Sequence, residues 1–264
     1  GSEMCIRDRL TRIIGVVSGK GGVGKTTFVS NLGAVLAQHF KKRVTVIDCN
    51  LTTSHLGLYL GMYYFPTTLN EVLRGESNIQ DAVYEHFTGM KIIPASLSSS
   101  KLAGADVTQI KNSIESILNN NDIILLDSSP GLGREAIACL RSCDEVLYIT
   151  TPYAPSVMDI VRCQEVANEV GAKPIGIVLN MVDKKGYEMA KEEIERLTRL
   201  PVLASIPYDK NVKKALAARL PVVVFKPHAA ASKEFYRFAT SLIGEAYREE
   251  RIISRILNRL KSIR

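Results

Sequence analysis

The sequence predicts an α/β fold: a doubly wound, mostly parallel β-sheet with helices on both faces. Short apolar runs recur along the 264-residue chain and alternate with segments of helical periodicity. The apolar runs are continuous rather than interrupted by polar residues, as in strands that are covered on both faces. A glycine-rich stretch directly follows the first apolar run and opens the first helical segment.

The expected elements follow one another along the chain. The first strand is expected over 13–17, the first helix over 26–39 and the second strand over 44–48. Further apolar runs predict strands over 90–94, 123–126, 146–150, 175–179 and 202–206. Helical periodicity between them predicts helices over 107–119, 156–170 and 187–199. Because ligands bind beyond the carboxyl ends of strands in such sheets, the residues that follow each strand are the candidate site.

Composition and length indicate one globular domain, expected over residues 11–244. Hydrophobic residues make up 46% of the chain and charged residues 23%, which excludes an intrinsically disordered protein. No run reaches the roughly 18 apolar residues of a membrane-spanning helix, and the polar start carries no secretory signal. Residues 1–10 are expected to be a tag-derived or disordered leader. Cysteines without a C-x-x-C pair favour a reducing compartment, so a cytoplasmic location is expected.

The strongest motif is a phosphate-binding loop that satisfies G-x-x-x-x-G-K-[ST] between a strand and a helix. Glycines allow backbone N–H groups to turn towards phosphate oxygens, and the following helix adds the positive end of its dipole. Its second lysine is expected to neutralise the β- and γ-phosphates, and its hydroxyl to bind Mg²⁺. The sequence therefore predicts binding of ATP with magnesium, and the expected nucleotide-binding residues here are Gly19, Lys20, Gly21, Gly22, Val23, Gly24, Lys25, Thr26 and Thr27.

Lys20 gives this loop the form K-G-G-x-G-K-T-T, which resembles the deviant Walker A loop of the ParA/MinD ATPases. The resemblance extends from Arg12 to Arg264. It implies a homodimer in the ATP state, in which Lys20 reaches across the interface to the partner's nucleotide. A cation donated in this way ties dimerisation to bound ATP, because two facing nucleotides would otherwise repel each other. The alternative for Lys20 is a solvated loop lysine.

The resemblance also implies a magnesium site and a γ-phosphate contact. Asp48 resembles the Walker A′ aspartate near the metal, and Asp127 resembles the Walker B aspartate that holds Mg²⁺ through water. Thr26 would complete this set of magnesium ligands. The N–H of Gly131, in the segment that resembles switch II, would contact the γ-phosphate.

Other residues would bind adenine. Asn180 resembles the family's adenine-reading asparagine. Pro207 and Asp209 match its second adenine loop, although Tyr208 stands where an acidic residue is usual. A lone Asn after a strand is ordinarily just a turn residue, so the ordered set carries the assignment.

One departure from the family pattern concerns the attacking water. Walker A′ normally reads Asp-x-Asp, whereas this chain has Asp48-Cys49-Asn50. An amide can orient water but cannot accept its proton. Phosphoryl transfer depends more on positioning and electrostatics than on proton abstraction, so we expect slow basal hydrolysis and a long-lived ATP state. The expected catalytic set is Lys20, Lys25, Asn50 and Asp127.

The C-terminal segment, residues 245–264, predicts an amphipathic helix. Residues 251–264 carry five basic residues and no acidic one, so most of the net charge of +7 lies there. The basic arc contains Arg251, Arg255, Arg259, Lys261 and Arg264. The apolar stripe consists of Ile252, Ile253, Ile256, Leu257, Leu260 and Ile263. This pattern suits an anionic membrane surface and resembles the terminal helix of MinD members, whereas the alternative is packing on the domain or on a partner chain.

These observations predict a dimerising Mg·ATP-dependent ATPase, bound peripherally to the inner face of the membrane in its ATP state. Its expected role is spatial positioning of a division site or of a polar or surface apparatus, with an activator or cargo adaptor as partner. A DNA-partitioning ParA-type ATPase is one alternative, but the basic charge lies in the tail rather than on a folded face. An iron–sulfur carrier is another, yet Cys139 and Cys143 are expected to be small buried thiols.

Overall fold

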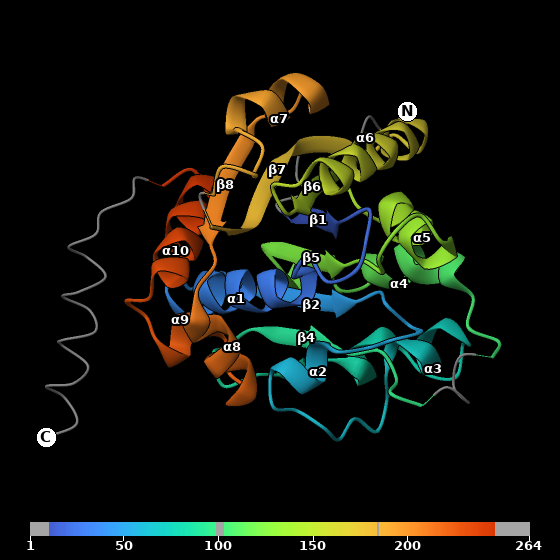
Figure 1. Ribbon diagram of the computed structural model, residues 1–264. Coiled ribbons are helices and arrows are strands. Elements are labelled where there is room, and N and C mark those ends of the chain that lie inside the picture. The colour runs from blue at the N-terminus through green and yellow to red at the C-terminus, as the bar shows by residue number, and fades with distance from the viewer. Residues whose placement is uncertain (1–10, 99–102, 184, 246–264) are drawn as a thin grey trace, which may run out of the picture.

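The computed structural model describes residues 11–98, 103–183 and 185–245 (Figure 1). Its strands are β1 (Arg12–Val17), β2 (Val44–Asp48), β3 (Tyr84–Glu85), β4 (Lys91–Ile93), β5 (Ile123–Asp127), β6 (Glu145–Thr150), β7 (Lys173–Val182) and β8 (Val202–Pro207). They form one eight-stranded sheet in the order β3-β4-β2-β5-β1-β6-β7-β8. Among the described residues, every neighbouring pair of strands is parallel except β3 with β4. The predicted doubly wound α/β class is confirmed.

Helices cover both faces of this sheet (Figure 1). They are α1 (Lys25–Gln38), α2 (Leu56–Tyr59), α3 (Leu69–Leu73), α4 (Ile110–Glu115), α5 (Arg134–Ser142), α6 (Ala154–Glu169), α7 (Lys191–Thr198), α8 (Lys210–Ala217), α9 (Val222–Phe225) and α10 (Ala230–Leu242). The core under one face contains residues of α1, α2, α8, α9 and α10, and the core under the other contains residues of α3, α4, α5, α6 and α7. Consecutive residues of β1 alternate between these cores, which explains its uninterrupted apolar run.

The helix expected over 107–119 is broken into three pieces. A 3₁₀ turn over Val107–Gln109 precedes α4, and a second one, Leu118–Asn120, follows it. The Asp106 carboxylate accepts the backbone N–H of Thr108 and begins the first turn. Asn121 ends the segment, because its amide donates to the Ile117 carbonyl and accepts the Thr45 hydroxyl of β2. The apolar periodicity correctly predicts helical structure in this segment, but tertiary hydrogen bonds divide it into three short pieces.

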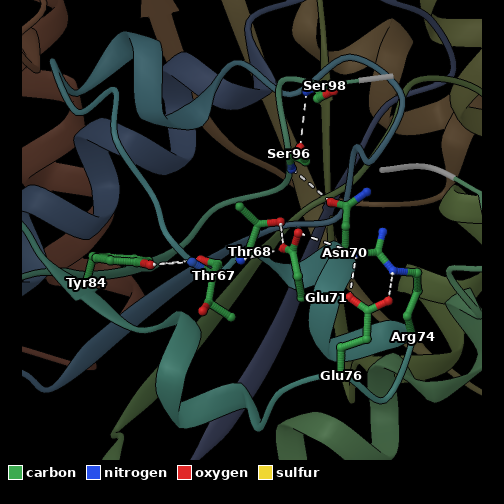
Figure 2. A network of polar contacts seen from close by, with 9 residues as sticks. All are labelled: Thr67, Thr68, Asn70, Glu71, Arg74, Glu76, Tyr84, Ser96 and Ser98. Carbon is green, nitrogen blue, oxygen red and sulfur yellow. Dashed lines mark hydrogen bonds and ion pairs between the residues drawn. The ribbon is translucent and has the colours of Figure 1, made fainter. Parts of the chain in front are cut away.

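A polar network secures the segment that crosses from β2 to β4 (Figure 2). The backbone N–H of Thr67 donates to the Tyr84 hydroxyl, which donates in turn to the Thr67 carbonyl. The buried Asn70 in α3 accepts the backbone N–H of Ser96 at 2.8 Å. Glu71 closes a capping box at the start of the same helix. This edge of the sheet is thus fixed by hydrogen bonds as well as by apolar packing.

Two predicted segments lie outside the described residues: the leader 1–10 and residues 246–264, which hold the membrane stripe from Arg251 to Ile263. The division of the chain into leader, domain and C-terminal helix therefore stays a prediction. Among the described helices, none has the length and apolar character that a membrane crossing requires.

Candidate functional site

The phosphate loop runs from the buried end of β1 to the first turn of α1. Gly22 and Gly24 have φ angles of 79° and 93°, a region that side chains rarely adopt. A Cβ on Gly24 would lie 2.4 Å from the amide nitrogen of Asn180, and one on Gly19 would lie 2.2 Å from the Cβ of Asp159 in α6. The glycines are therefore required by backbone conformation at two positions and by close packing at Gly19.

Lys25 is held inside this loop. Its side chain is buried, and Nζ donates to the Ser18 hydroxyl at 2.6 Å. That hydroxyl donates to the Lys20 carbonyl, so the loop and its lysine are connected. Burial lowers the pKa of Lys25, and the nearby carboxylate of Asp127 opposes this effect. A bound phosphate would supply the further negative charge that a buried ammonium favours.

Two carboxylates lie side by side at the carboxyl ends of β2 and β5. Asp48 and Asp127 are direct partners in the strand register, and each is about 1% exposed. Asp48 accepts the Ser54 hydroxyl at 2.7 Å and the Asn50 backbone N–H at 3.0 Å. Burial raises the pKa of both carboxyl groups, and the charge of Asp48 raises that of Asp127 further.

Magnesium fits this arrangement. Among the described residues, Oδ1 of Asp127 is a buried oxygen with no hydrogen-bond partner. A hydrogen bond from the Thr26 hydroxyl opposes the rise in the pKa of Asp127, so this hydroxyl lies close to the carboxylate. Mg²⁺ prefers oxygen ligands and would compensate two adjacent buried negative charges. The ligand roles predicted for Thr26, Asp48 and Asp127 are therefore chemically consistent with the structure.

A cavity of about 340 Å³ lies in front of the loop. Seven predicted site residues line it: Gly21, Gly22, Gly24, Lys25, Thr26, Thr27 and Asn50. Ser128 and Pro130, which also line it, belong to the segment that resembles switch II. Its other lining residues are Thr53, His55, Tyr59, Met181 and Leu216. Met181 is the least expected of these, because its φ of 58° is unusual for a residue with a side chain.

Asn50 shapes the segment after β2. Its side-chain oxygen accepts the Thr53 hydroxyl at 3.1 Å, and its amide nitrogen donates to the Thr53 carbonyl at 2.9 Å. Both ends of the amide thus hold a local turn beside the cavity. The sequence predicts that the Asn50 amide orients the attacking water. In that role the amide would bind water in addition to Thr53, or in place of one of these bonds.

Gly131 is bonded back to the phosphate loop. Its backbone N–H, the predicted γ-phosphate donor, donates to the Ser18 carbonyl at 3.0 Å. Contact with a γ-phosphate would therefore require this bond to break. The segment that follows β5 lies against the loop in the structure. Only this segment would have to move for the Gly131 N–H to exchange the Ser18 carbonyl for a phosphate oxygen.

None of the three predicted adenine residues, Asn180, Pro207 and Asp209, lines the cavity. Asn180 donates its amide to the Val23 carbonyl of the loop at 2.8 Å and lies against Gly24, which does line the cavity. Asp209 caps two helices instead, since its carboxylate accepts the backbone N–H groups of Asn211 and Ala231. Neither Asp209 nor Pro207 lines the cavity. Their adenine contacts stay a prediction. Asp209 has a structural role as the N-cap of α8, a position where aspartate is common, and its bond to Ala231 joins that cap to α10.

Residues 14–222 match the family model described as the CobQ/CobB/MinD/ParA nucleotide binding domain. The chain belongs to this family. The predicted MinD/ParA resemblance is thereby confirmed on a match that spans most of the described domain. As a member of this group, the chain is an ATPase whose cofactors are ATP and magnesium, as predicted.

Individual MinD/ParA relatives agree with this assignment. An ATP-binding protein of Methanocaldococcus jannaschii is 33% identical over 234 residues, which are 89% of this chain and 88% of the relative. The cell division ATPase MinD of Pyrococcus furiosus has a TM-score of 0.85 and 32% identity, covering 88% of this chain and 98% of that one. The septum site-determining protein MinD of Pyrococcus horikoshii, complexed with Mg-ADP, has a TM-score of 0.84 and 30% identity, covering 88% and 96%.

The cysteines of this MinD/ParA ATPase are placed as small core residues. Cys139 in α5 and Cys143, which directly follows that helix, are both buried, as expected. Cys143 packs against β1, where a Cβ on Gly15 would lie 2.7 Å from its sulfur. Among the described residues, no group of three or more His, Cys, Asp or Glu side chains is arranged to hold a metal ion.

Proposed function

We propose that this chain is a MinD-like ATPase that dimerises with bound Mg·ATP and then attaches to an anionic membrane surface. From that surface it positions a division site or another polar or surface apparatus, and hydrolysis returns it to a monomer. The observation that carries the proposal is the contrast between two lysines of one loop. Lys25 is buried beside its own nucleotide site, whereas Lys20 is exposed.

Lys20 is suited to act on a second molecule. It does not line the nucleotide cavity of its own chain, and it forms no salt bridge within the described residues. Its backbone carbonyl is nevertheless fixed by the Ser18 hydroxyl, so its position depends on the phosphate loop. A cation presented in this way would stabilise a dimer only when a partner brings phosphate charge to it.

Membrane attachment is supported by the sequence of residues 251–264. Each basic residue near an anionic leaflet contributes about 1 kcal/mol, and aliphatic side chains add to this. A single short segment must also become ordered on binding, so one copy would bind weakly. Two copies in a dimer raise the apparent affinity by roughly 10²–10⁴ through avidity. Nucleotide state would thus control membrane residence without contact between ATP and lipid.

Replacing Lys20 tests the dimer. With a non-hydrolysable ATP analogue and Mg²⁺, we expect the wild-type chain to sediment as a dimer and Lys20→Gln to remain a monomer. Lys173→Gln is the matched control, because Lys173 is also exposed but is the first residue of β7. It therefore lies at the amino ends of the parallel strands, whereas the loop lies at their carboxyl ends. Analytical ultracentrifugation measures both. A wild-type chain that stays monomeric at high concentration would contradict the proposal.

Vesicle sedimentation tests the membrane step. Vesicles that contain phosphatidylglycerol should pellet the wild-type chain with ATP but much less with ADP, and neutral phosphatidylcholine vesicles should pellet little in either state. Pelleting that is independent of nucleotide would argue against coupling through a dimer. ATP-dependent, salt-sensitive binding to duplex DNA without vesicle binding would favour the DNA-partitioning alternative instead.

A further inference from the structure

A second cavity, of about 730 Å³, lies on the face that α4, α5 and α6 cover. It shares no lining residue with the nucleotide cavity. Its walls are residues 107–112, the outer side of α5 and the carboxyl end of α6, which are neighbours in the fold (Figure 1). Val107, Ile137 and Val170 give it an apolar floor, and each is partly exposed. We call this cavity the α5 groove.

The rim of the α5 groove is basic. Lys111, Arg134 and Arg141 are exposed, and within the described residues none of them forms a salt bridge. Glu169 is the one carboxylate among the described lining residues. The positive charge of this rim is a local feature, because residues 1–250 together have almost no net charge. Hydrogen bonds from Thr108 and the nearby charge of Arg134 lower the pKa of Asp106, so this carboxylate also lies close to the rim. The groove therefore combines an apolar floor with three cations, Lys111, Arg134 and Arg141, against two carboxylates, Glu169 and Asp106.

The spacing along α5 gives the groove a defined pattern. Arg134, Ile137, Ala138 and Arg141 follow one another at intervals that place them on one side of a helix. Cys139 and Leu140, on the opposite side of α5, are buried in the core, and Ala138 is buried at the base of the groove. The two arginines are separated by about two turns, roughly 10 Å along the axis, with the apolar pair between them.

α5 is connected to two of the segments that line the nucleotide cavity, those that follow β2 and β5. α5 begins shortly after Ser128 and Pro130, which line that cavity. In its first turn, the Glu135 carboxylate accepts the hydroxyl of Thr52 at 2.6 Å, and Thr52 belongs to the segment after β2. A ligand on the outer side of α5 would therefore contact an element that is tied to the nucleotide site from two directions.

We propose that the α5 groove binds an acidic amphipathic segment of a partner protein. Two of its carboxylates would pair with Arg134 and Arg141, while an apolar side chain between them packs on Ile137. Arginine favours such pairing because its guanidinium can donate two parallel hydrogen bonds to a carboxylate. An apolar floor between charges suits a peptide better than a nucleic acid, whose backbone offers charge without an apolar face. This proposal depends on neither the dimer nor the membrane contact above.

A peptide library tests the proposal with defined probes. A phage-displayed library of random dodecapeptides is selected on the ADP-loaded chain, and the enriched peptides are synthesised and measured by fluorescence anisotropy. We expect enriched sequences with acidic residues on both sides of an apolar one. Arg141→Glu should weaken their binding about tenfold or more, because the reversed charge repels the carboxylate. Arg196→Glu, the same charge reversal at an exposed position of α7, should leave binding unchanged.

Hydrogen exchange locates the bound peptide. Protection confined to residues 107–112 and 134–142 would support the proposal. Enriched peptides without the acidic and apolar pattern, or binding that Arg141→Glu leaves intact, would overturn it. A duplex DNA oligonucleotide that binds with the same dependence on Arg141 would overturn it in favour of a nucleic-acid surface. Loss of the ATP-dependent dimer in Arg141→Glu would overturn it in favour of a second copy of the chain.

Discussion

At the scale of single residues, the phosphate loop gives two lysines opposite environments only a few positions apart. Lys25 lies inside, bonded to the Ser18 hydroxyl and close to Asp127, while Lys20 stays exposed. The cause is local: left-handed glycines turn the backbone inward between them. Because both conformation and motif are local, this part of the site could be predicted from the sequence.

Other site residues could be predicted only in part, since their partners are remote in sequence. Asp48 and Asp127 were expected at one magnesium site because both resemble family motifs, and the strand register places them together. The bond from Asn180 to Val23, and the capping of α10 by Asp209, depend on how distant segments pack. No local pattern encodes such contacts. Met181 likewise lines the cavity with a positive φ angle, which the sequence around it does not predict.

Asn50→Asp tests the catalytic consequence of the amide. An aspartate there could accept a proton from the attacking water, but it would lose the donated bond to the Thr53 carbonyl. We expect steady-state ATP turnover to rise by about tenfold, since positioning already supplies most of the catalysis. Phosphate release measures this rate, with Asn50→Ala as the comparison that removes both functions. A rate for Asn50→Asp at or below that of the wild type would show that the amide does not limit hydrolysis.

His86 makes folding stability depend on pH. Its side chain is 2% exposed, its Nδ1 lies 2.8 Å from the Thr88 hydroxyl, and burial lowers its pKa from 6.5 to about 4. As the pH falls below 6.5, the unfolded chain binds the proton first, so stability present above pH 6.5 is lost between about pH 6.5 and 4. We expect a loss of about 2–3 kcal/mol from this group.

Urea unfolding of the wild type and His86→Gln, at pH 7 and pH 4.5, measures the effect. The variant keeps every other titratable group of the chain, so the difference between the two pH dependences isolates His86. The wild type should lose more stability than the variant on acidification. Parallel losses in the two proteins would rule out a buried neutral imidazole.

At the scale of elements, apolar periodicity located the strands of the central sheet but not the boundaries of several helices. β1, β2, β5, β6, β7 and β8 all contain the strand cores expected for them. The segment expected as one helix over 107–119 is divided by bonds to Asp106 and Asn121. The edge strand β3 was not predicted, since it is only two residues long and carries no apolar run. The longer helix α10 was not predicted either, although seven of its residues are buried. The buried strands of the central sheet are therefore readable from the sequence, whereas short edge strands and several helices are not.

Asn70→Ala tests how much the polar network at this edge contributes (Figure 2). The substitution leaves the backbone N–H of Ser96 without its acceptor in a buried place. A buried donor without a partner costs about 1–3 kcal/mol, and we expect the free energy of unfolding to fall by that amount. Chemical denaturation measures it, and Asn168→Ala, at an exposed position of α6, is the control. Equal stabilities of the two variants would mean that packing alone holds this edge.

At the scale of the whole molecule, charge and function are separated along the chain. The nucleotide site lies at the carboxyl ends of the central strands, within a nearly neutral domain. The basic and apolar residues of 251–264 lie outside that domain in the sequence. If the dimer pairs two such segments, the same residues that bind weakly in one copy bind strongly in two. Two kinds of change should therefore abolish the proposed membrane contact: one that prevents dimerisation, and one that removes the apolar stripe.

A pair of charge-matched variants separates these two failures. Ile256→Asp with Leu260→Asp adds two negative charges within the apolar stripe, whereas Ser254→Asp with Asn258→Asp adds the same charge on the polar side. Vesicle pelleting with ATP should be abolished in the first variant and only reduced in the second, because burial of an aspartate in the acyl region is far more costly than a changed surface charge. Both variants should still dimerise, since the nucleotide-binding residues lie outside 251–264. Equal pelleting of the two would mean that charge alone holds the chain at the membrane, and that the apolar stripe packs elsewhere.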